Sequence, residues 1–189
     1  MALRLRRTYE RALRQTGEMT ALAAAEVEAR LRLRNEAVSR WSVGEQLDHM
    51  VKVDRGILDL LERALQPEPA TPPAQPPQPA RPVRPVSFAG RIVLLTRYIP
   101  RGAGKSPEPY LPVEPEPADL RAGIAEVAGR LRALEPRLAD LERCPGLWRH
   151  PRFGGLNAAQ WLCFVDIHQH HHLKIIRDIA RARSANPPR

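Results

Sequence analysis

Two histidines near the C-terminus have the spacing of metal ligands. His168 and His172 are four positions apart, so on a helix both imidazoles project from the same face and can bind one metal ion. Apolar residues at helical spacing share that face: Trp161, Val165, Ile175 and Ile179. The face is therefore predicted to point into the protein, where polar nitrogens without partners cost free energy and a metal ion would satisfy them.

A third histidine lies far from this pair in the sequence. His49 follows a predicted helix start and can supply a third nitrogen from the opposite side of a helical bundle. Three neutral histidine ligands with an open fourth position are typical of catalytic rather than closed structural zinc sites. We expect zinc or nickel there, with iron or manganese as the next candidates. Spacing alone equally fits hydrogen-bonded core histidines or a His-rich tract on a surface helix.

Four other side chains near these positions can take part in chemistry. His171 borders the face of the histidine pair and is a candidate substrate-facing or supporting residue, although a structural role is favoured. His150 precedes the last predicted helix and can reach the metal, although a turn role is favoured there. Glu45 can act as a general base, but a helix cap already explains it. His170 should face solvent.

Helices must position these side chains, because Leu, Ala and Arg dominate the chain and β-branched runs are short. The capping box Ser42-Val-Gly-Glu45 starts a helix that runs to about Leu65, and Asn157-Ala-Ala-Gln160 starts another that runs to about Arg183. Two further helices are predicted, from Arg4 to about Asn35 with a break near Gly17, and from Asp119 to Arg143 with a kink at Pro136.

The remaining segments read as connections. Residues 66–117 are rich in proline, which removes backbone donors, and form a crossover between the second and third helices. Within it, residues 87–98 are apolar enough for a short helix, with a strand as the alternative. Residues 144–155 are a predicted loop and 184–189 a frayed tail. The fold class is therefore all-α: a four-helix bundle in which residues 1–189 form a single domain.

Composition narrows the functional classes. The net charge of +9 comes mostly from arginines that are scattered along all 189 residues, without the interleaved aromatics of a nucleic-acid groove. Nucleic-acid binding is therefore not favoured. The sequence shows no export signal and no run of 18 apolar residues, so we expect no membrane association. Two cysteines without a CxxC pairing are typical of a reducing compartment, so a cytoplasmic location is expected.

Three segments resemble the DinB-like (damage-inducible B), or YfiT-like, superfamily. Trp41-Ser-Val-Gly-Glu-Gln-Leu-Asp-His49 is similar to its W-S-x-x-E-x-L-x-H signature, and His168-x-x-His171-His172 resembles its H-x-x-H-H ending. The stretch from His150 to Trp161 resembles the lead into the last helix of that superfamily. The resemblance implies a four-helix bundle with a metal bound by one histidine of the second helix and two of the last, which are His49, His168 and His172.

The resemblance also implies a range of activities, because the superfamily includes bacillithiol S-transferases, mycothiol-dependent maleylpyruvate isomerases and proteins described as metal-dependent hydrolases. We expect a metal-dependent enzyme of the thiol transferase or hydrolase type that acts on a small molecule, with a low-molecular-weight thiol as a candidate partner. The alternatives are a non-catalytic metal-binding stress-response module and, suggested by charge alone, a DNA-associated protein. A homodimer is plausible for such a bundle, but the sequence gives no interface signal.

Overall fold

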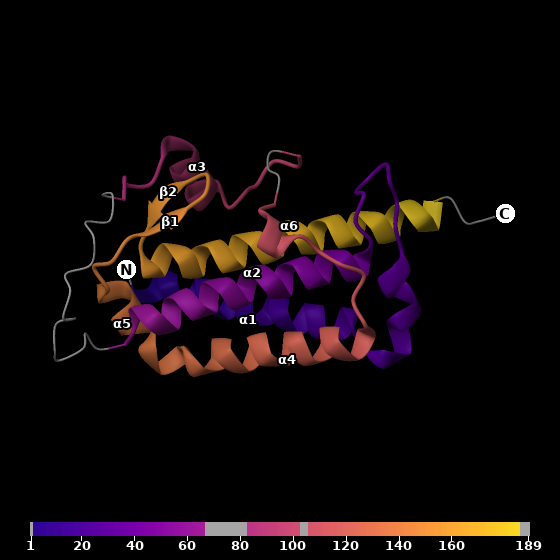
Figure 1. The fold of residues 1–189 in the computed structure, drawn as a ribbon, viewed down its shortest axis with the longest axis horizontal. Helices are drawn as coiled ribbons and strands as arrows, with labels where there is room; N and C mark the ends of the chain where they lie inside the picture. Colours follow the sequence, from indigo (N-terminus) through magenta and orange to yellow (C-terminus); the bar gives the residue numbers. More distant parts are fainter. Residues whose placement is uncertain (1, 67–82, 103–105, 186–189) are drawn as a thin grey trace.

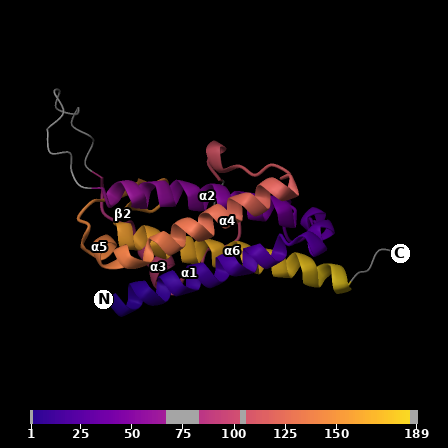
Figure 2. The same cartoon turned by 90° about the horizontal axis from the view of Figure 1, so that it is seen from below.

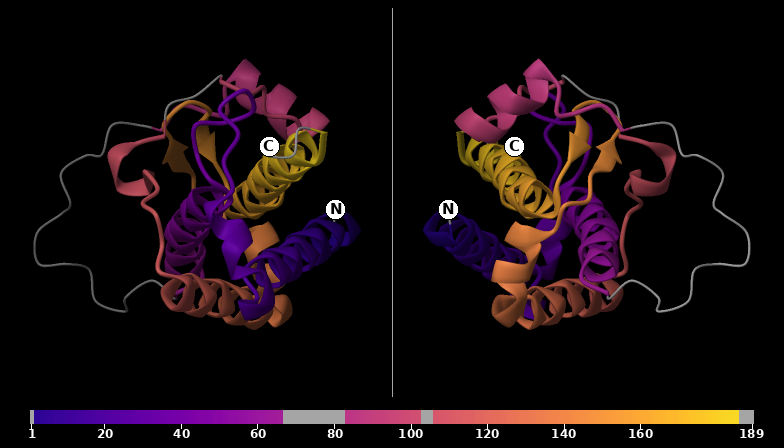
Figure 3. Two further views of the ribbon diagram at one scale, coloured as in Figure 1. Left: turned by 90° about the vertical axis from the view of Figure 1, so that its right-hand side faces the viewer. Right: turned by 90° about the vertical axis from the view of Figure 1, so that its left-hand side faces the viewer.

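Four long helices form a bundle in the computed structural model, which describes residues 2–66, 83–102 and 106–185 (Figure 1). They are α1 (Ala2–Leu22), α2 (Val43–Ala64), α4 (Pro117–Ala133) and α6 (Ala158–Ala185). Seen end-on, α1 lies diagonally opposite α2 and α4 lies opposite α6 (Figure 3). Accordingly, α1 and α2 each pack mainly against α4 and α6. The predicted all-α bundle is confirmed.

The core of the bundle is made of the apolar faces of these helices. Six of its fully buried side chains, contributed by all four long helices, are Met19, Leu47, Met50, Leu131, Leu162 and Leu173. Full burial of such a side chain contributes about 1.5–3 kcal/mol relative to exposure. This packing fixes the distance between α2 and α6, which carry the three candidate metal ligands.

Reciprocal caps start both of these helices at the predicted positions. At α2, the backbone N–H of Glu45 donates to Ser42 Oγ at 3.1 Å, and that of Ser42 donates to the Glu45 carboxylate at 2.6 Å. At α6, the Gln160 N–H donates to Asn157 Oδ1 at 2.8 Å, and the Asn157 N–H donates to Gln160 Oε1 at 2.9 Å. Each cap fixes the start of its helix and therefore which residues face inward.

The prediction for the first helix is wrong after residue 22 and at the expected break near Gly17. α1 continues through Gly17 without interruption and ends at Leu22. Ala24 is extended, with φ −58° and ψ 148°, and a 3₁₀ segment, η1 (Ala25–Arg32), follows. Helix propensity alone favoured one helix to Asn35, but the η1 segment packs against α1, α2 and α4, and this tertiary packing overrides propensity.

The third predicted helix is divided at its proline, as expected. α4 begins at Pro117, two positions before the predicted start, and lies between α1 and α2 when the bundle is seen from below (Figure 2). A short 3₁₀ turn, η3 (Glu135–Arg137), contains Pro136, and α5 (Leu138–Arg143) completes the segment. The missing proline N–H and its ring interrupt the α-helical hydrogen-bond pattern there.

The connections contain more regular structure than predicted at one place. Residues 144–155, predicted as a loop, include an antiparallel hairpin of β1 (Trp148–His150) and β2 (Gly154–Leu156). Gly154 explains the turn, because its φ of +78° suits glycine and an added Cβ would lie 2.6 Å from the Pro85 carbonyl oxygen. The apolar segment after residue 87 forms a helix rather than a strand, α3 (Phe88–Thr96), and a 3₁₀ turn, η2 (Glu108–Tyr110), follows.

Parts of two predictions lie outside the described residues. These are positions 67–82 and 103–105 of the proline-rich crossover and positions 186–189 of the tail. Residues 184 and 185, predicted as part of the frayed tail, are still helical.

No helix in the described part of the chain is long and apolar enough to cross a membrane.

Candidate metal centre

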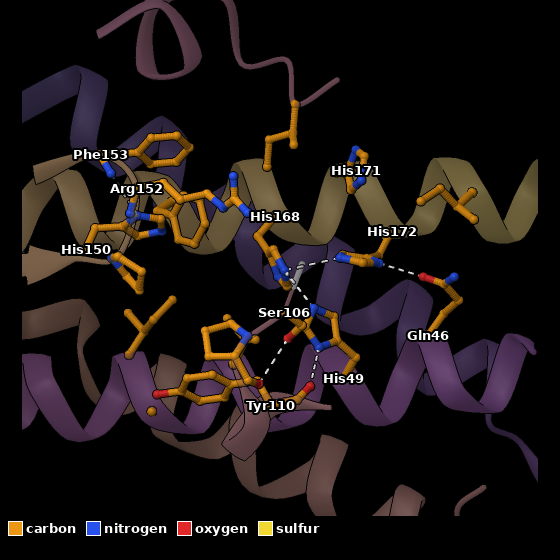
Figure 4. Close-up of a pocket in the computed structure, with 18 of the residues that line it drawn as sticks. Gln46, His49, Ser106, Tyr110, His150, Arg152, Phe153, His168, His171 and His172 are labelled. Carbon is orange, nitrogen blue, oxygen red and sulfur yellow. Dashed lines mark hydrogen bonds between the residues drawn. The ribbon is translucent and has the colours of Figure 1, made fainter. Parts of the chain in front are cut away.

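Three imidazole rings meet between α2 and α6 (Figure 4). Nε2 of His168 lies 3.2 Å from Nε2 of His49 and 3.1 Å from Nε2 of His172. All three side chains are buried, and their candidate ligand atoms lie within 4.8 Å of one another. The fold therefore brings together the three histidines that the sequence singled out, although His49 and His168 are 119 positions apart.

Two of the rings are oriented by hydrogen bonds at their outer nitrogens. Nδ1 of His49 lies 2.6 Å from the carbonyl oxygen of Tyr110, and Nδ1 of His172 lies 2.6 Å from Oε1 of Gln46. The Gln46 amide is itself oriented, since its Nε2 donates to Ser39 Oγ at 2.9 Å. Because both oxygens only accept, both Nδ1 atoms carry the proton, and the inner Nε2 atoms of the neutral rings present lone pairs.

The inner nitrogens thus form a donor set that fits a cation. If Nε2 of His168 carries a proton, it can donate fully to only one neighbour, and the lone pair of the other ring stays unpaired. Nδ1 of His168 is buried without a hydrogen-bond partner in the described structure. Nitrogens about 2.0–2.1 Å from a tetrahedral zinc ion lie about 3.3–3.4 Å apart, close to the Nε2 spacings found here.

Burial keeps the three rings in the form that binds metal. Desolvation is the main cause that lowers the pKa of His49, and it lowers those of His168 and His172 well below the ordinary range. For the latter two, the charge of a neighbouring histidine lowers the pKa further. All three imidazoles are therefore neutral at physiological pH, with lone pairs available as ligands.

Aromatic rings pack around the histidines. The ring of Trp41 lies 4.9 Å, centroid to centroid, from that of His49 and stacks at 6.2 Å on that of His172. The ring of Phe164 lies 5.6 Å from that of His168. These contacts limit the rotation of the three imidazole rings.

The three histidines also line a cavity of about 730 Å³ between α2, α6, the hairpin and the segment before η2. This volume is in the range of small-molecule sites, about 300–1,000 Å³. Apolar and aromatic side chains supply much of its wall, including Val53, Ile57, Leu60, Trp161, Phe164 and Ile175. No aspartate or glutamate of the described chain lines it, and the group of possible metal ligands contains no fourth member.

Of the other predicted site residues, some line this cavity and others do not. Glu45 does not line it, and its carboxylate accepts from the Ser42 N–H and pairs with Arg34 at 2.8 Å. His170 is exposed, as expected. His150 does line the cavity and also has the turn role, since its Nδ1 accepts from the backbone N–H groups of Arg152 and Phe153 at 3.1 and 3.2 Å.

His171 lies in the wall of the cavity one position before a triad member. It is hydrogen-bonded to the carbonyl of Ile99. Burial first and the nearby Arg101 second lower its pKa to about 4, so the ring is neutral at physiological pH.

Sequence reasoning missed two residues that orient the histidines. Gln46 lies three positions before His49, so it shares that helix face, and this spacing could have identified it. Tyr110 lies in the proline-rich connection, where no periodicity gives a signal, and it acts through a backbone carbonyl that any residue would provide.

A second buried polar cluster joins α1, α2 and α6 away from the cavity lining. Nε2 of Gln169 donates to Asp54 Oδ2 at 2.8 Å and to Thr16 Oγ1 at 3.0 Å. Asp54 is fully buried without a cationic partner among the described residues, and desolvation raises its pKa to about 7. Its carboxyl group therefore holds its proton to a higher pH than an ordinary aspartate does.

Comparison with known proteins gives one match. The model of the DinB superfamily matches residues 5–176, a range that contains all three histidines, the whole of α2 and α4, and most of α1 and α6. No match was found among curated proteins or among solved structures.

Proposed function

Since the chain belongs to the DinB superfamily, we propose that it is a metal-dependent enzyme of the thiol S-transferase or hydrolase type. In this proposal His49, His168 and His172 hold one divalent transition metal, with zinc or nickel preferred for three imidazole ligands. The observation that carries the proposal is that Nε2 of His168 lies 3.1–3.2 Å from those of His49 and His172, in the wall of a cavity large enough for a small molecule.

The surrounding residues would hold the ligands in place before any ion binds. The N–H groups of His49 and His172 donate to Tyr110 and Gln46, so their lone pairs are fixed in direction. Such preorganisation lowers the cost of forming the site. A bound divalent ion with an open position would lower the pKa of a water or a low-molecular-weight thiol and so supply a nucleophile.

Two further histidines can serve proton transfer in the cavity. Nδ1 of His150 accepts two backbone hydrogen bonds, so in the neutral ring Nε2 carries the proton and can donate to a substrate. His171 donates one N–H to Ile99, which leaves its other nitrogen with a lone pair able to accept a proton. Glu45 is a poorer candidate base because the helix cap and Arg34 engage its carboxylate.

The geometry favours an enzyme over a non-catalytic metal-binding module. A purely structural site would normally be closed by a fourth protein ligand. In the described part of the chain the ligand group stops at three histidines, and the cavity lies beside them.

The test begins with metal content, measured by elemental analysis of protein purified without a His tag. We expect about one transition metal per chain, lost in the His49→Ala, His168→Ala double variant and kept in His170→Ala, whose side chain is exposed on the same helix as His168. The metal-loaded protein is then assayed for thiol transfer to 1-chloro-2,4-dinitrobenzene and for p-nitrophenyl ester hydrolysis. Equal turnover by the metal-free double variant would reject the proposal.

A further inference from the structure

The charged side chains that line the cavity all have the same sign. Five arginines contribute to its wall: Arg40, Arg63, Arg101, Arg149 and Arg152. No aspartate or glutamate of the described chain does so. The whole chain has 30 basic and 21 acidic residues, so a mixed lining would be expected from composition alone.

Three of these arginines lack the ion pairs that many arginines elsewhere on the surface form. Outside the cavity, Arg130 pairs with Asp59 and Glu62, and Arg177 pairs with Glu18. In the cavity wall, Arg101 pairs with Asp178. By contrast, Arg40, Arg63 and Arg149 form no ion pair with any described residue. Their guanidinium N–H groups are therefore available to donate to an anion in the cavity.

The arginines surround the cavity from separate segments. Arg40 precedes α2, Arg63 lies near its C-terminal end, Arg101 follows α3, and Arg149 and Arg152 belong to the hairpin. In Figure 4 the side chain of Arg152 extends from the hairpin turn toward His168. A divalent ion at the triad would add further positive charge with no carboxylate in the described wall to balance it.

We propose that this cavity binds a small organic anion. Its carboxylate, phosphate or sulfonate group pairs with the arginines, which offer paired N–H donors to such groups. Its apolar or aromatic body lies against the wall formed by residues such as Ile57, Trp161 and Phe164. The inference rests on the proposed function, since the anion would be the substrate or co-substrate of that site.

A small molecule suits this wall better than a nucleic acid. A nucleic-acid groove tracks an extended backbone with arginines and presents aromatic rings for stacking along an open surface. Here the aromatic side chains of Trp41, Trp161 and Phe164 line the cavity and pack on the histidines or on one another.

The test compares two probes of the same shape, naphthalene-2-carboxylate and the neutral naphthalene-2-carboxamide, by isothermal titration calorimetry. Both are titrated into the metal-free and the zinc-loaded full-length protein, so that direct coordination by zinc is separated from pairing with arginine. The variants are Arg149→Gln with Arg152→Gln on the hairpin, and Arg40→Gln at the start of α2, which leaves the hairpin unchanged. Arg14→Gln is the matched control, because Arg14 is exposed on α1 and does not line the cavity.

We expect the metal-free wild type to bind the carboxylate at least about tenfold more tightly than the carboxamide, as charge-assisted hydrogen bonds allow. The cavity variants should lose most of this preference and Arg14→Gln should keep it. Equal affinity for the two probes, no binding of either at millimolar concentration, or equal weakening by Arg14→Gln would overturn the proposal. So would displacement of the carboxylate by a short DNA duplex that binds more tightly.

The two proposals fail separately. If the His49→Ala, His168→Ala protein holds no metal but still prefers the carboxylate, the anion site is supported whatever the fate of the enzyme proposal. If the wild type binds one metal and shows no preference, only the anion site is rejected.

Discussion

The phenol ring of Tyr110 lies directly against Gly56 of α2, where an added Cβ would come within 2.8 Å of the Tyr110 hydroxyl oxygen. The carbonyl group of the same tyrosine accepts the hydrogen bond of His49. The absence of a side chain at Gly56 therefore lets η2 approach α2 closely enough to orient a ligand two turns earlier on the helix. A position with no chemistry of its own thus contributes to the geometry of the candidate metal centre.

We expect Gly56→Ala to lower zinc affinity by about tenfold, the lower end of the range for disturbing a residue that supports a ligand. The new methyl group must displace the Tyr110 ring and with it the carbonyl that holds His49. Competition with a fluorescent zinc chelator measures the effect. Gly129→Ala on α4 is the control, because nothing lies within 4 Å of its Cβ position. Wild-type zinc affinity in Gly56→Ala would contradict this account.

Gln46→Leu should weaken zinc binding by about 10- to 100-fold. The substitution removes the amide oxygen that accepts from the outer nitrogen of His172 at 2.6 Å, so this hydrogen bond no longer limits rotation of the ring. Gln46→Glu keeps an acceptor in place and should retain affinity, which the same chelator competition can measure. Equal loss in both variants would show that the buried position tolerates no change, rather than that His172 needs an acceptor.

Asp54→Asn should become increasingly stabilising, relative to wild type, as the pH rises from 5 to 8. Burial raises the folded pKa of Asp54 from 3.8 to about 7, so the folded state holds a proton that the unfolded state releases. The stability linked to this proton is fully present below pH 4 and is lost as pH rises through 7. Three pKa units correspond to at most about 4 kcal/mol.

Urea unfolding of both proteins across this pH range measures the difference in the free energy of unfolding. Other groups titrate alike in both proteins and cancel in the comparison. A difference that does not change with pH would mean that the Asp54 carboxyl group keeps an ordinary pKa.

Asp166→Asn should destabilise the protein by about 1–3 kcal/mol, the scale of lost hydrogen bonds to a charged group. The buried carboxylate pairs with Arg11 of α1 at 3.0 Å and with Arg97, at the C-terminal end of α3, at 2.7 Å. Urea unfolding measures the change, and hydrogen exchange should rise in α3. The more exposed Asp178→Asn should cost under about 1 kcal/mol. Equal costs would show that Asp166 is not a specific anchor for α3.

The sequence predicted those features that depend on local spacing. The capping boxes at Ser42 and Asn157 placed the starts of α2 and α6, because both partners of each cap lie three positions apart. The apolar face around His168 and His172 predicted their burial, because helical periodicity alone decides which residues share a face.

Features that depend on tertiary packing were not predictable in this way. The 3₁₀ segment after Ala24 has the composition of a helix, and only its packing against neighbouring helices separates it from α1. The hairpin at residues 148–156 is too short for an alternating pattern to reveal it. The arginines of the cavity wall come from four separate segments, so no window of sequence could group them.

The diagonal placement of α1 and α2 affects how the chain folds during its synthesis on the ribosome. Because each of these helices packs mainly on α4 and α6, which follow them in the sequence, α1 and α2 are synthesised before the helices that cover them. Contacts between residues so distant in sequence make folding slow and leave apolar faces uncovered in the nascent chain. His49 can therefore meet His168 only after α6 has been synthesised, and any metal site that needs both residues forms after that point.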